Sequence, residues 1–298
     1  MELISILGSG TMGNGIAHAL AIAGYRVNLI DISQKKLANG MNSIAKNLDR
    51  QVSKSLITEE LKISALNHIQ TFTDTQSGVL NSDLVIEAAT ENLEIKLEIF
   101  KNLDKFCKPE AILASNTSSI SISKIASVTR RADKIIGMHF MNPVPLMKLV
   151  EVIRANSTSD QVTKTIMQLA LRLNKIPVEV NDSPGFVANR ILMPMINEAI
   201  HTLDEGVAGV TEIDTVMKLG MAHPMGPLQL ADFIGLDVCL AILNVLQEGF
   251  ANPKYAPCSL LVNMVTAGNL GIKSGLGFYD YSNGSNELVI SGQFRKGG

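Results

Sequence analysis

Two residues that can move a proton lie at the edges of neighbouring apolar segments. His139 lies at the end of the apolar run KIIGMHF, and Glu151 lies within the run KLVEVI, twelve residues further on. A histidine near its ordinary pKa accepts a proton at neutral pH, and a carboxylate on its other ring nitrogen fixes the tautomer and stabilises the imidazolium. For either residue alone, a core histidine at a strand end or a glutamate that points outward is the better interpretation. The elements around the pair decide whether it predicts catalysis.

A glycine-rich turn near the N-terminus predicts a dinucleotide cofactor. Residues 3–7 form an apolar run of strand length, residues 8–13 read GSGTMG, a G-x-G-x-x-G motif, and residues 14–23 have apolar residues at helical spacing. In this context the first glycine allows a tight turn, the second lets the backbone approach a pyrophosphate, and the third lets the helix pack on the strand. The predicted cofactor-binding residues of this turn are Gly8, Gly10, Thr11, Met12 and Gly13.

Asp31 indicates which dinucleotide binds. It ends the second predicted strand, residues 25–30, eighteen residues after Gly13, where a carboxylate accepts hydrogen bonds from both hydroxyls of the adenosine ribose. A 2′-phosphate at this place would be repelled, and the two residues that follow supply no arginine. NAD is therefore predicted over NADP, although Lys35 and Lys36 leave NADP open.

The composition excludes several classes of protein. The net charge of −2 gives no reason to expect nucleic-acid binding, and no uncharged run is long enough to span a membrane. The three cysteines form no C-x-x-C pair and the five histidines form no H-x-x-x-H pair, so neither a disulfide framework nor a metal site is predicted. The apolar N-terminus follows no basic segment and is broken by glycines, unlike a signal peptide. We expect a protein of a reducing compartment, the cytoplasm.

The first part of the chain alternates between strand and helix patterns. Further strands are predicted near 69–72, 83–89, 111–116, 134–140, 148–153 and 177–180, and further helices near 34–54, 93–106, 121–127 and 158–174. This alternation predicts an α/β fold with a doubly wound, mostly parallel Rossmann-type sheet over residues 1–182.

The pattern changes at the sequence NDSPGF, residues 181–186. Beyond it only helical patterns occur, at about 185–205, 211–220, 226–248 and 257–267. We therefore predict a second, smaller all-helical domain over residues 183–282. Residues 283–298 are interpreted as a short tail, either partly mobile or left from expression.

The polar residues of the first domain gather at strand ends, where ligands bind in open parallel sheets. Residues 116–119, NTSS, follow one strand, and His139 and Asn142 close another. Removal of hydride from an alcohol leaves a proton on oxygen, which a base must accept. In a dinucleotide-binding fold, the pair therefore predicts His139 as general base and Glu151 as the residue that orients it.

Seven motifs occur in order along the chain: GSGTMGNGIA, ENLEIKLEIF, ASNTSSISI, GMHFMNPVPLMKLVEV, DSPGFVANR, HPMGPLQLADFIGLD and GLGFYDY. In these motifs the chain resembles the short-chain L-3-hydroxyacyl-CoA dehydrogenases, and among them the bacterial 3-hydroxybutyryl-CoA dehydrogenases most of all. The resemblance covers residues 1–282. It implies an NAD-dependent oxidoreductase that interconverts (3S)-3-hydroxyacyl-CoA and 3-oxoacyl-CoA, with acetoacetyl-CoA as the best single guess for the 3-oxo substrate.

The resemblance also implies roles for individual residues. The family's histidine–glutamate pair matches His139 and Glu151, its serine that contacts substrate and cofactor matches Ser118, and its asparagine that donates to the substrate carbonyl matches Asn189. We expect one of Ser118 and Ser119 to cap the nearby helix and the other to contact ligand. The implied cofactor contacts, beside the glycine turn, are Asp31, Glu91, Lys96, Asn142 and Lys273. For the two lysines, an ordinary surface position is the alternative interpretation.

The substrate and the assembly follow from the same resemblance. Lys46, Arg50 and Lys54 recur every four residues along the 34–54 helix, opposite its apolar face, and Lys54 matches a lysine that contacts CoA. We predict that Arg50 and Lys54 bind the CoA phosphates, although a solvated basic face is the simpler alternative. A homodimer through the helical domain is expected. The remaining alternatives for function are a related hydroxy-acid or sugar dehydrogenase and a non-catalytic, crystallin-like protein that retains NAD binding.

Overall fold

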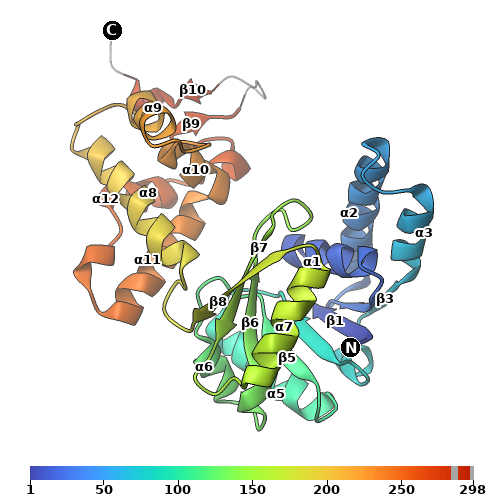
Figure 1. The fold of residues 1–298 in the computed structure, drawn as a ribbon. Coiled ribbons are helices and arrows are strands. Elements are labelled where there is room, and N and C mark those ends of the chain that lie inside the picture. The colour runs from blue at the N-terminus through green and yellow to red at the C-terminus, as the bar shows by residue number, and fades with distance from the viewer. Residues whose placement is uncertain (283–287, 296–298) are drawn as a thin grey trace. The chain divides into compact units, whose positions relative to one another are not determined.

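The computed structural model describes residues 1–282 and 288–295 (Figure 1). The chain divides into two compact units, Met1–Ser183 and Pro184–Gly298. Each unit has its own buried apolar cluster, so each is described by itself.

The first unit is built on one eight-stranded sheet. Its strands are β1 (Leu3–Leu7), β2 (Arg26–Ile30), β3 (Ile69–Phe72), β4 (Leu84–Glu87), β5 (Ile112–Ser115), β6 (Ile135–Phe140), β7 (Leu149–Arg154) and β8 (Ile176–Asn181). They lie in the order β3-β2-β1-β4-β5-β6-β7-β8, and every neighbouring pair is parallel except β6 and β7. The predicted doubly wound, mostly parallel sheet is therefore confirmed. The single antiparallel pair is the place where the chain turns back through the loop that joins the segments of His139 and Glu151.

Helices flank this sheet (Figure 1). They are α1 (Thr11–Ile22), α2 (Gln34–Ser53), α3 (Glu59–Asn67), α4 (Thr75–Val79), α5 (Leu93–Phe106), α6 (Ile122–Ala126) and α7 (Asp160–Arg172), with a 3-10 turn η1 (Ala132–Lys134). Helices α3 and α4 were not predicted, because α3 fully buries only Ala65 and α4 has five residues. Their starts carry a local signal: the side chains of Thr58 and Asp74 cap the two helices.

The second unit is mainly helical. Its helices are α8 (Ala188–Asp204), α9 (Val210–Gly220), α10 (Pro227–Ile234), α11 (Leu236–Phe250) and α12 (Ser259–Thr266), with 3-10 turns η2 (Pro253–Tyr255), η3 (Ile272–Ser274) and η4 (Gly292–Phe294). The prediction of one helix over 226–248 is wrong, because α10 and α11 meet at an angle of 97°. Gly235 lies at the break with φ +103°, a backbone conformation that side chains with a Cβ rarely adopt.

A short two-stranded sheet adds to the helical unit. Strands β9 (Tyr279–Asp280) and β10 (Val289–Ile290) pair antiparallel, so the second unit is not all-helical. The described part of the segment interpreted as a tail, residues 288–295, packs against this unit, since the ring of Phe294 stacks on Phe278 with centroids 5.6 Å apart. Residues 283–287 and 296–298 of that segment lie outside the described residues.

Within the described residues, no single helix is both long and apolar enough to cross a bilayer; only α10 and α11 taken together reach that length and composition, across their bend. The same residues contain no cluster of histidine, cysteine and acidic side chains that could hold a metal ion.

Candidate active site

His139 and Glu151 are direct cross-strand neighbours. They pair in register on the antiparallel strands β6 and β7, so the two side chains lie on the same face of the sheet. His139 Nδ1 lies 2.7 Å from Glu151 Oε2, and both side chains are buried. Because an ionised carboxylate only accepts hydrogen bonds, Nδ1 carries the proton and Nε2 is the basic nitrogen of the neutral ring. The eleven residues between the two contain the strand ends and the loop that bring the imidazole and the carboxylate together.

The three glycines of the N-terminal turn have different surroundings. A Cβ on Gly8 would lie 2.5 Å from the Ala88 carbonyl oxygen, and Gly8 has φ +104°, so the turn requires glycine here. A Cβ on Gly13 would lie 1.8 Å from the Gly8 carbonyl oxygen, which shows how closely α1 packs on the turn. A Cβ on Gly10 would meet nothing within 4 Å. The backbone at Gly10 is therefore open to a ligand, while the other two glycines close the turn behind it.

The start of α1 suits an anion. Its N-cap, Gly10, provides no side-chain hydrogen bond to the first turn, and that turn contains no acidic residue. The first N–H groups of a helix lack partners within the helix, and the helix dipole makes this end positive. Together with the open space at Gly10, this arrangement fits the pyrophosphate of a dinucleotide.

Asp31 lies beside this turn, directly after β2. Its Oδ2 accepts hydrogen bonds of 2.8 Å from both the N–H and the hydroxyl of Ser9, and its Oδ1 accepts from the N–H of Ile32 at 2.8 Å. The ammonium of Lys36 lies 3.8 Å from Oδ1. The carboxylate is thus fixed in orientation at the mouth of the glycine turn, as hydrogen bonding to a ribose requires.

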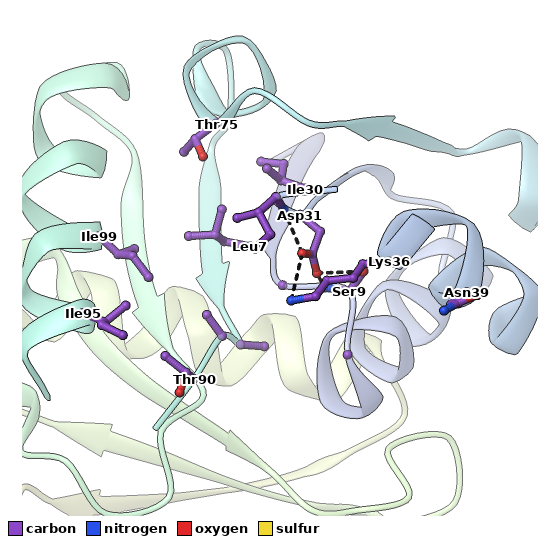
Figure 2. A pocket seen from close by; sticks show the side chains of 15 residues that line it. Leu7, Ser9, Ile30, Asp31, Lys36, Asn39, Thr75, Thr90, Ile95 and Ile99 are labelled. Carbon is purple, nitrogen blue, oxygen red and sulfur yellow. Dashed lines mark hydrogen bonds and ion pairs between the residues drawn. The ribbon is translucent and has the colours of Figure 1, made fainter. Parts of the chain in front are cut away.

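A cleft of about 650 Å³ joins these elements. Figure 2 shows Ile95 and Ile99 of α5 on one side of this cleft and Asp31 with Lys36 on the other. Ile32, which also lines the cleft, is 84% exposed. A ligand that covered this apolar side chain would bind more tightly for burying it. A cleft with apolar walls, a fixed carboxylate and an uncapped helix start fits the adenosine half of a dinucleotide, so the described residues fit the predicted cofactor.

Glu91 organises the loop that follows β5. Its Oε1 accepts from the Thr117 hydroxyl at 2.6 Å, from the Ser118 N–H at 2.8 Å and from the Ser118 hydroxyl at 3.1 Å. The N–H and the hydroxyl of Ser119 both lie 3.2 Å from the same oxygen. Burial opposes ionisation of Glu91, but Lys96 and these donors lower its pKa below the ordinary value. The expectation that Ser118 or Ser119 caps the next helix is wrong, because Ser121 caps α6 and both serines turn to Glu91.

Lys96 is not a surface lysine. It is 1% exposed, and its Nζ lies 2.7 and 2.8 Å from the two carboxylate oxygens of Glu87 and 3.4 Å from Glu91 Oε2. Glu87, the last residue of β4, was not predicted as a site residue. An acid inside an apolar strand was the available signal, since a buried carboxylate needs a partner.

A second buried lysine, Lys175, hydrogen-bonds the loop after β6. Asn142 is exposed two residues beyond the end of β6, and its peptide bond to Pro143 is cis. Lys175 donates to the carbonyl oxygens of Val144 at 2.5 Å and Met147 at 2.7 Å. On the neighbouring strand end, Asn116 Oδ1 accepts from the Phe140 N–H at 2.9 Å, so Asn116 fixes the end of β6. These contacts place Asn142 at the same sheet edge as His139.

The other predicted site residues belong to helix α2 and to the second unit. Arg50 and Lys54 are exposed at the C-terminal end of α2, whose opposite face is buried. Asn189 lies in the first turn of α8, in the second unit. Lys273 lies in η3 of that unit and forms an ion pair with Asp237. The roles of these four residues stay predictions.

Both units match models of one family. Residues 3–183 match the NAD binding domain of 3-hydroxyacyl-CoA dehydrogenase, and residues 185–281 match the C-terminal domain of the same enzyme. The chain belongs to the 3-hydroxyacyl-CoA dehydrogenase family. The predicted family and the predicted class, an NAD-dependent oxidoreductase, are therefore confirmed.

Relatives of this dehydrogenase family match over nearly the whole chain. A probable 3-hydroxybutyryl-CoA dehydrogenase of Bacillus subtilis is 53% identical, with 94% of this chain and 98% of the relative covered. The human mitochondrial hydroxyacyl-coenzyme A dehydrogenase is 43% identical, with 93% and 90% covered. The crystal structure of the (S)-3-hydroxybutyryl-CoA dehydrogenase of Ralstonia eutropha superimposes with a TM-score of 0.91 at 51% identity, covering 94% of this chain and 99% of that chain.

Proposed function

We propose that the protein interconverts a short-chain (3S)-3-hydroxyacyl-CoA and the 3-oxoacyl-CoA, with 3-hydroxybutyryl-CoA and acetoacetyl-CoA as its substrate pair. The observation that carries this proposal is the cross-strand contact of 2.7 Å between His139 and Glu151 at the sheet edge of a dinucleotide-binding unit. The bacterial relatives at 49–53% identity are named 3-hydroxybutyryl-CoA dehydrogenases, which supports the short acyl chain.

His139 acts as the general base in the direction of oxidation. Its Nε2 accepts the proton of the substrate 3-hydroxyl, while Nδ1–H donates to Glu151 and the carboxylate stabilises the imidazolium that forms. A bound dinucleotide, held at the glycine turn and Asp31, would supply the acceptor for the hydride of substrate C3. In reduction His139 returns the proton to the 3-oxo oxygen. Ser118 and Asn189 hydrogen-bond the substrate oxygens in this proposal, and Glu91 holds Ser118 in place.

NAD rather than NADP is the cofactor in this proposal, because Asp31 would repel a 2′-phosphate. Lys36 lies 3.8 Å from Asp31 and offsets part of this repulsion, although its side chain is more than half exposed and screened by water. Asp31, with three hydrogen bonds of 2.8 Å, is the better ordered of the two charges.

Two assays test the proposal. The wild type should turn over acetoacetyl-CoA with NADH, should lose efficiency as the acyl chain grows, and should work poorly with NADPH. Asp31→Ser should raise KM for NADH by about tenfold, since a hydrogen bond to a charged group is worth about 1.5–3 kcal/mol, and should relax the rejection of NADPH. Lys36→Ala is the matched control and should sharpen the rejection. A wild type that prefers NADPH contradicts the cofactor assignment, and NADH binding without turnover of any acyl-CoA would indicate a crystallin-like protein.

We propose a homodimer through the second unit. Large apolar side chains there are exposed, among them Val216 and Leu219 of α9 at 60% and 83%. Light scattering should give twice the chain mass of 32.1 kDa, and a monomer at micromolar concentration would contradict this assignment. The location in the cytoplasm stays a prediction.

A further inference from the structure

The carboxylate of Glu87 is fully buried at the end of β4 and uses both of its oxygens. The two oxygens bind Lys96 Nζ at 2.7 and 2.8 Å. The Ser115 hydroxyl donates to Oε2 at 2.7 Å, and the Ala89 N–H donates to Oε1 at 2.7 Å. Glu87 is 0% exposed, so a ligand that enters from solvent cannot contact it directly. It is instead a fixed point within the sheet.

Lys96 connects this fixed point to the surface of the site. Its ammonium has three donors, of which two meet Glu87, and Glu91 Oε2 lies 3.4 Å away. Lys96 is 1% exposed, so its ammonium is not hydrated by bulk solvent. The two carboxylates are its ion-pair partners and hold it in place.

Glu91 then divides its two oxygens between two tasks. Oε2 faces Lys96, while Oε1 accepts from the Thr117 hydroxyl and from the N–H and hydroxyl of Ser118. Charged acceptors make the stronger hydrogen bonds, so this oxygen orders the loop. The result is a continuous series of contacts from a buried carboxylate, through an ammonium and a second carboxylate, to Ser118.

We propose that Glu87 is a positioning residue for the reaction, acting on Ser118 through Lys96 and Glu91. This inference rests on the proposed function, in which Ser118 contacts the substrate. If Glu87 loses its charge, Lys96 keeps Glu91 as its sole carboxylate partner in this series, and an ammonium in a buried site attracts its remaining partner strongly. Glu91 then moves toward Lys96, and Oε1 releases the Ser118 loop.

A purely structural role predicts something different. If Glu87 only neutralises Lys96, its loss lowers stability without a specific link to Ser118. Asp104 provides the comparison, because it is a buried carboxylate of the same unit, paired with Arg131 at 2.8 Å, and belongs to none of the predicted site residues. Its loss should cost stability only.

The experiment compares Glu87→Gln with Asp104→Asn in the full-length protein. Thermal unfolding, NADH affinity by fluorescence, and kcat and KM for acetoacetyl-CoA are measured for both. We expect both variants to unfold at lower temperature, kcat/KM to fall by about tenfold in Glu87→Gln, and kcat/KM to stay within about twofold in Asp104→Asn. Equal kinetic losses in the two variants would overturn the proposal.

A double-mutant cycle with Ser118→Ala decides whether the effect passes through Ser118. If it does, Glu87→Gln should cost little further activity in the Ser118→Ala background, since residues that act as a unit are not additive. Full multiplication of the two losses would overturn the proposal while leaving the proposed function intact. Wild-type kinetics in Ser118→Ala would instead refute the proposed role of Ser118. Should Glu87→Gln fail to fold, Glu87→Asp keeps the charge but withdraws it by one methylene, and the same cycle with that variant gives the same test.

Discussion

The two units of this dehydrogenase each hold a pair of acidic side chains and treat them in opposite ways. In the first unit Glu87 and Glu91 share the ammonium of Lys96. In the second unit Asp214 and Asp232 form no ion pair with any described residue. They are held by backbone N–H groups, and by the hydroxyls of Tyr279 on Asp214 and Tyr281 on Asp232, at 2.7 and 3.1 Å.

The pKa values reflect this difference. Burial opposes ionisation of Glu91, but Lys96 and the loop donors lower its pKa. Burial raises the pKa of Asp214, and it raises the pKa of Asp232 to about 6, with Asp214 as a nearby like charge. Glu91 of the first unit therefore stays ionised at neutral pH, whereas Asp232 of the second unit takes up a proton as the pH falls through about 6.

The backbone around each acidic pair shows a different structural role. A Cβ on Gly226 would lie 2.2 Å from Asp214 Cγ, and a Cβ on Gly277 would lie 1.9 Å from Asp232 Oδ1. The backbone comes this close because Asp214 accepts from Leu228 N–H and Asp232 accepts from Phe278 N–H. In the second unit the carboxylates fasten distant chain segments together. In the first unit they hold the ammonium of Lys96 and the serine loop after β5, next to the predicted catalytic residues.

The largest expected effect tests the first unit. His139→Ala should lower kcat by roughly 10²–10⁴-fold, because a positioned general base contributes that much. NADH affinity should stay unchanged, since His139 takes part in proton transfer and not in the predicted cofactor contacts. Steady-state kinetics with fluorescence titration of NADH measures both. Near-normal turnover in a folded variant would show that another residue is the base.

The next effect contrasts the stability of the units in acid. The folded-state pKa of Asp232, about 6, exceeds the ordinary 3.8, so the folded second unit binds a proton that the unfolded chain does not hold between these values. Its stability should rise by about 3 kcal/mol at most as the pH falls from 7 to 4, since one unit of pKa is worth about 1.4 kcal/mol. In the first unit, burial opposes ionisation of Asp83, but Lys108 and two N–H groups lower its pKa to about 2, so stability is lost as the pH falls from about 4 toward 2.

Hydrogen exchange, corrected for the intrinsic effect of pH, measures this contrast within one sample. Protection of α10 and α11 should increase between pH 7 and pH 4, and protection of β1 and β4 should fall below pH 4. Asp232→Asn removes one of the two titrating groups and should reduce the increase, with the remainder assigned to Asp214. Parallel loss of protection in both units on acidification would contradict the assignment of a raised pKa to the second unit.

A smaller effect sharpens the description of the catalytic pair. Glu151→Gln keeps an acceptor for Nδ1–H but removes the charge that stabilises the imidazolium, so kcat should fall by about tenfold. The pH–rate profile should shift to lower pH, because the neutral amide no longer favours the protonated ring. An unchanged profile would mean that Glu151 does not act on His139.

The sequence predicts best what is local. The glycine turn and Asp31 follow from spacing within one strand–turn–helix–strand unit, and the pairing of His139 with Glu151 follows from two strands joined by one loop. Glu87 could not be assigned, because its partners come from α5 and from β5, and only the folded sheet brings them together.

The break at Gly235 is the opposite case: a local pattern predicts a continuous helix, and tertiary packing interrupts it. Helical spacing of apolar residues continues through it, so periodicity predicts one helix over 226–248. The bend of 97° depends on tertiary packing, in which Gly271 and Gly277 approach Asp232 near the end of α10. A glycine within a helical pattern was the available signal, but it does not distinguish a tolerated residue from a break.

The smallest expected effect concerns the substrate handle on α2. Arg50 and Lys54 are exposed, and they form no ion pair with any described residue, so they are available to phosphate groups. An exposed charge pair is worth about 0.2–1 kcal/mol, so Lys54→Ala should raise KM for acetoacetyl-CoA by about two- to fivefold and leave KM for NADH unchanged. The increase in KM should shrink at high salt, and KM for a truncated thioester without the nucleotide should be the same in Lys54→Ala and the wild type. Lys46→Ala, on the same exposed face but further from the C-terminal end of α2, is the matched control. Equal effects on both substrates would show that this basic row has a structural role and that CoA binds elsewhere.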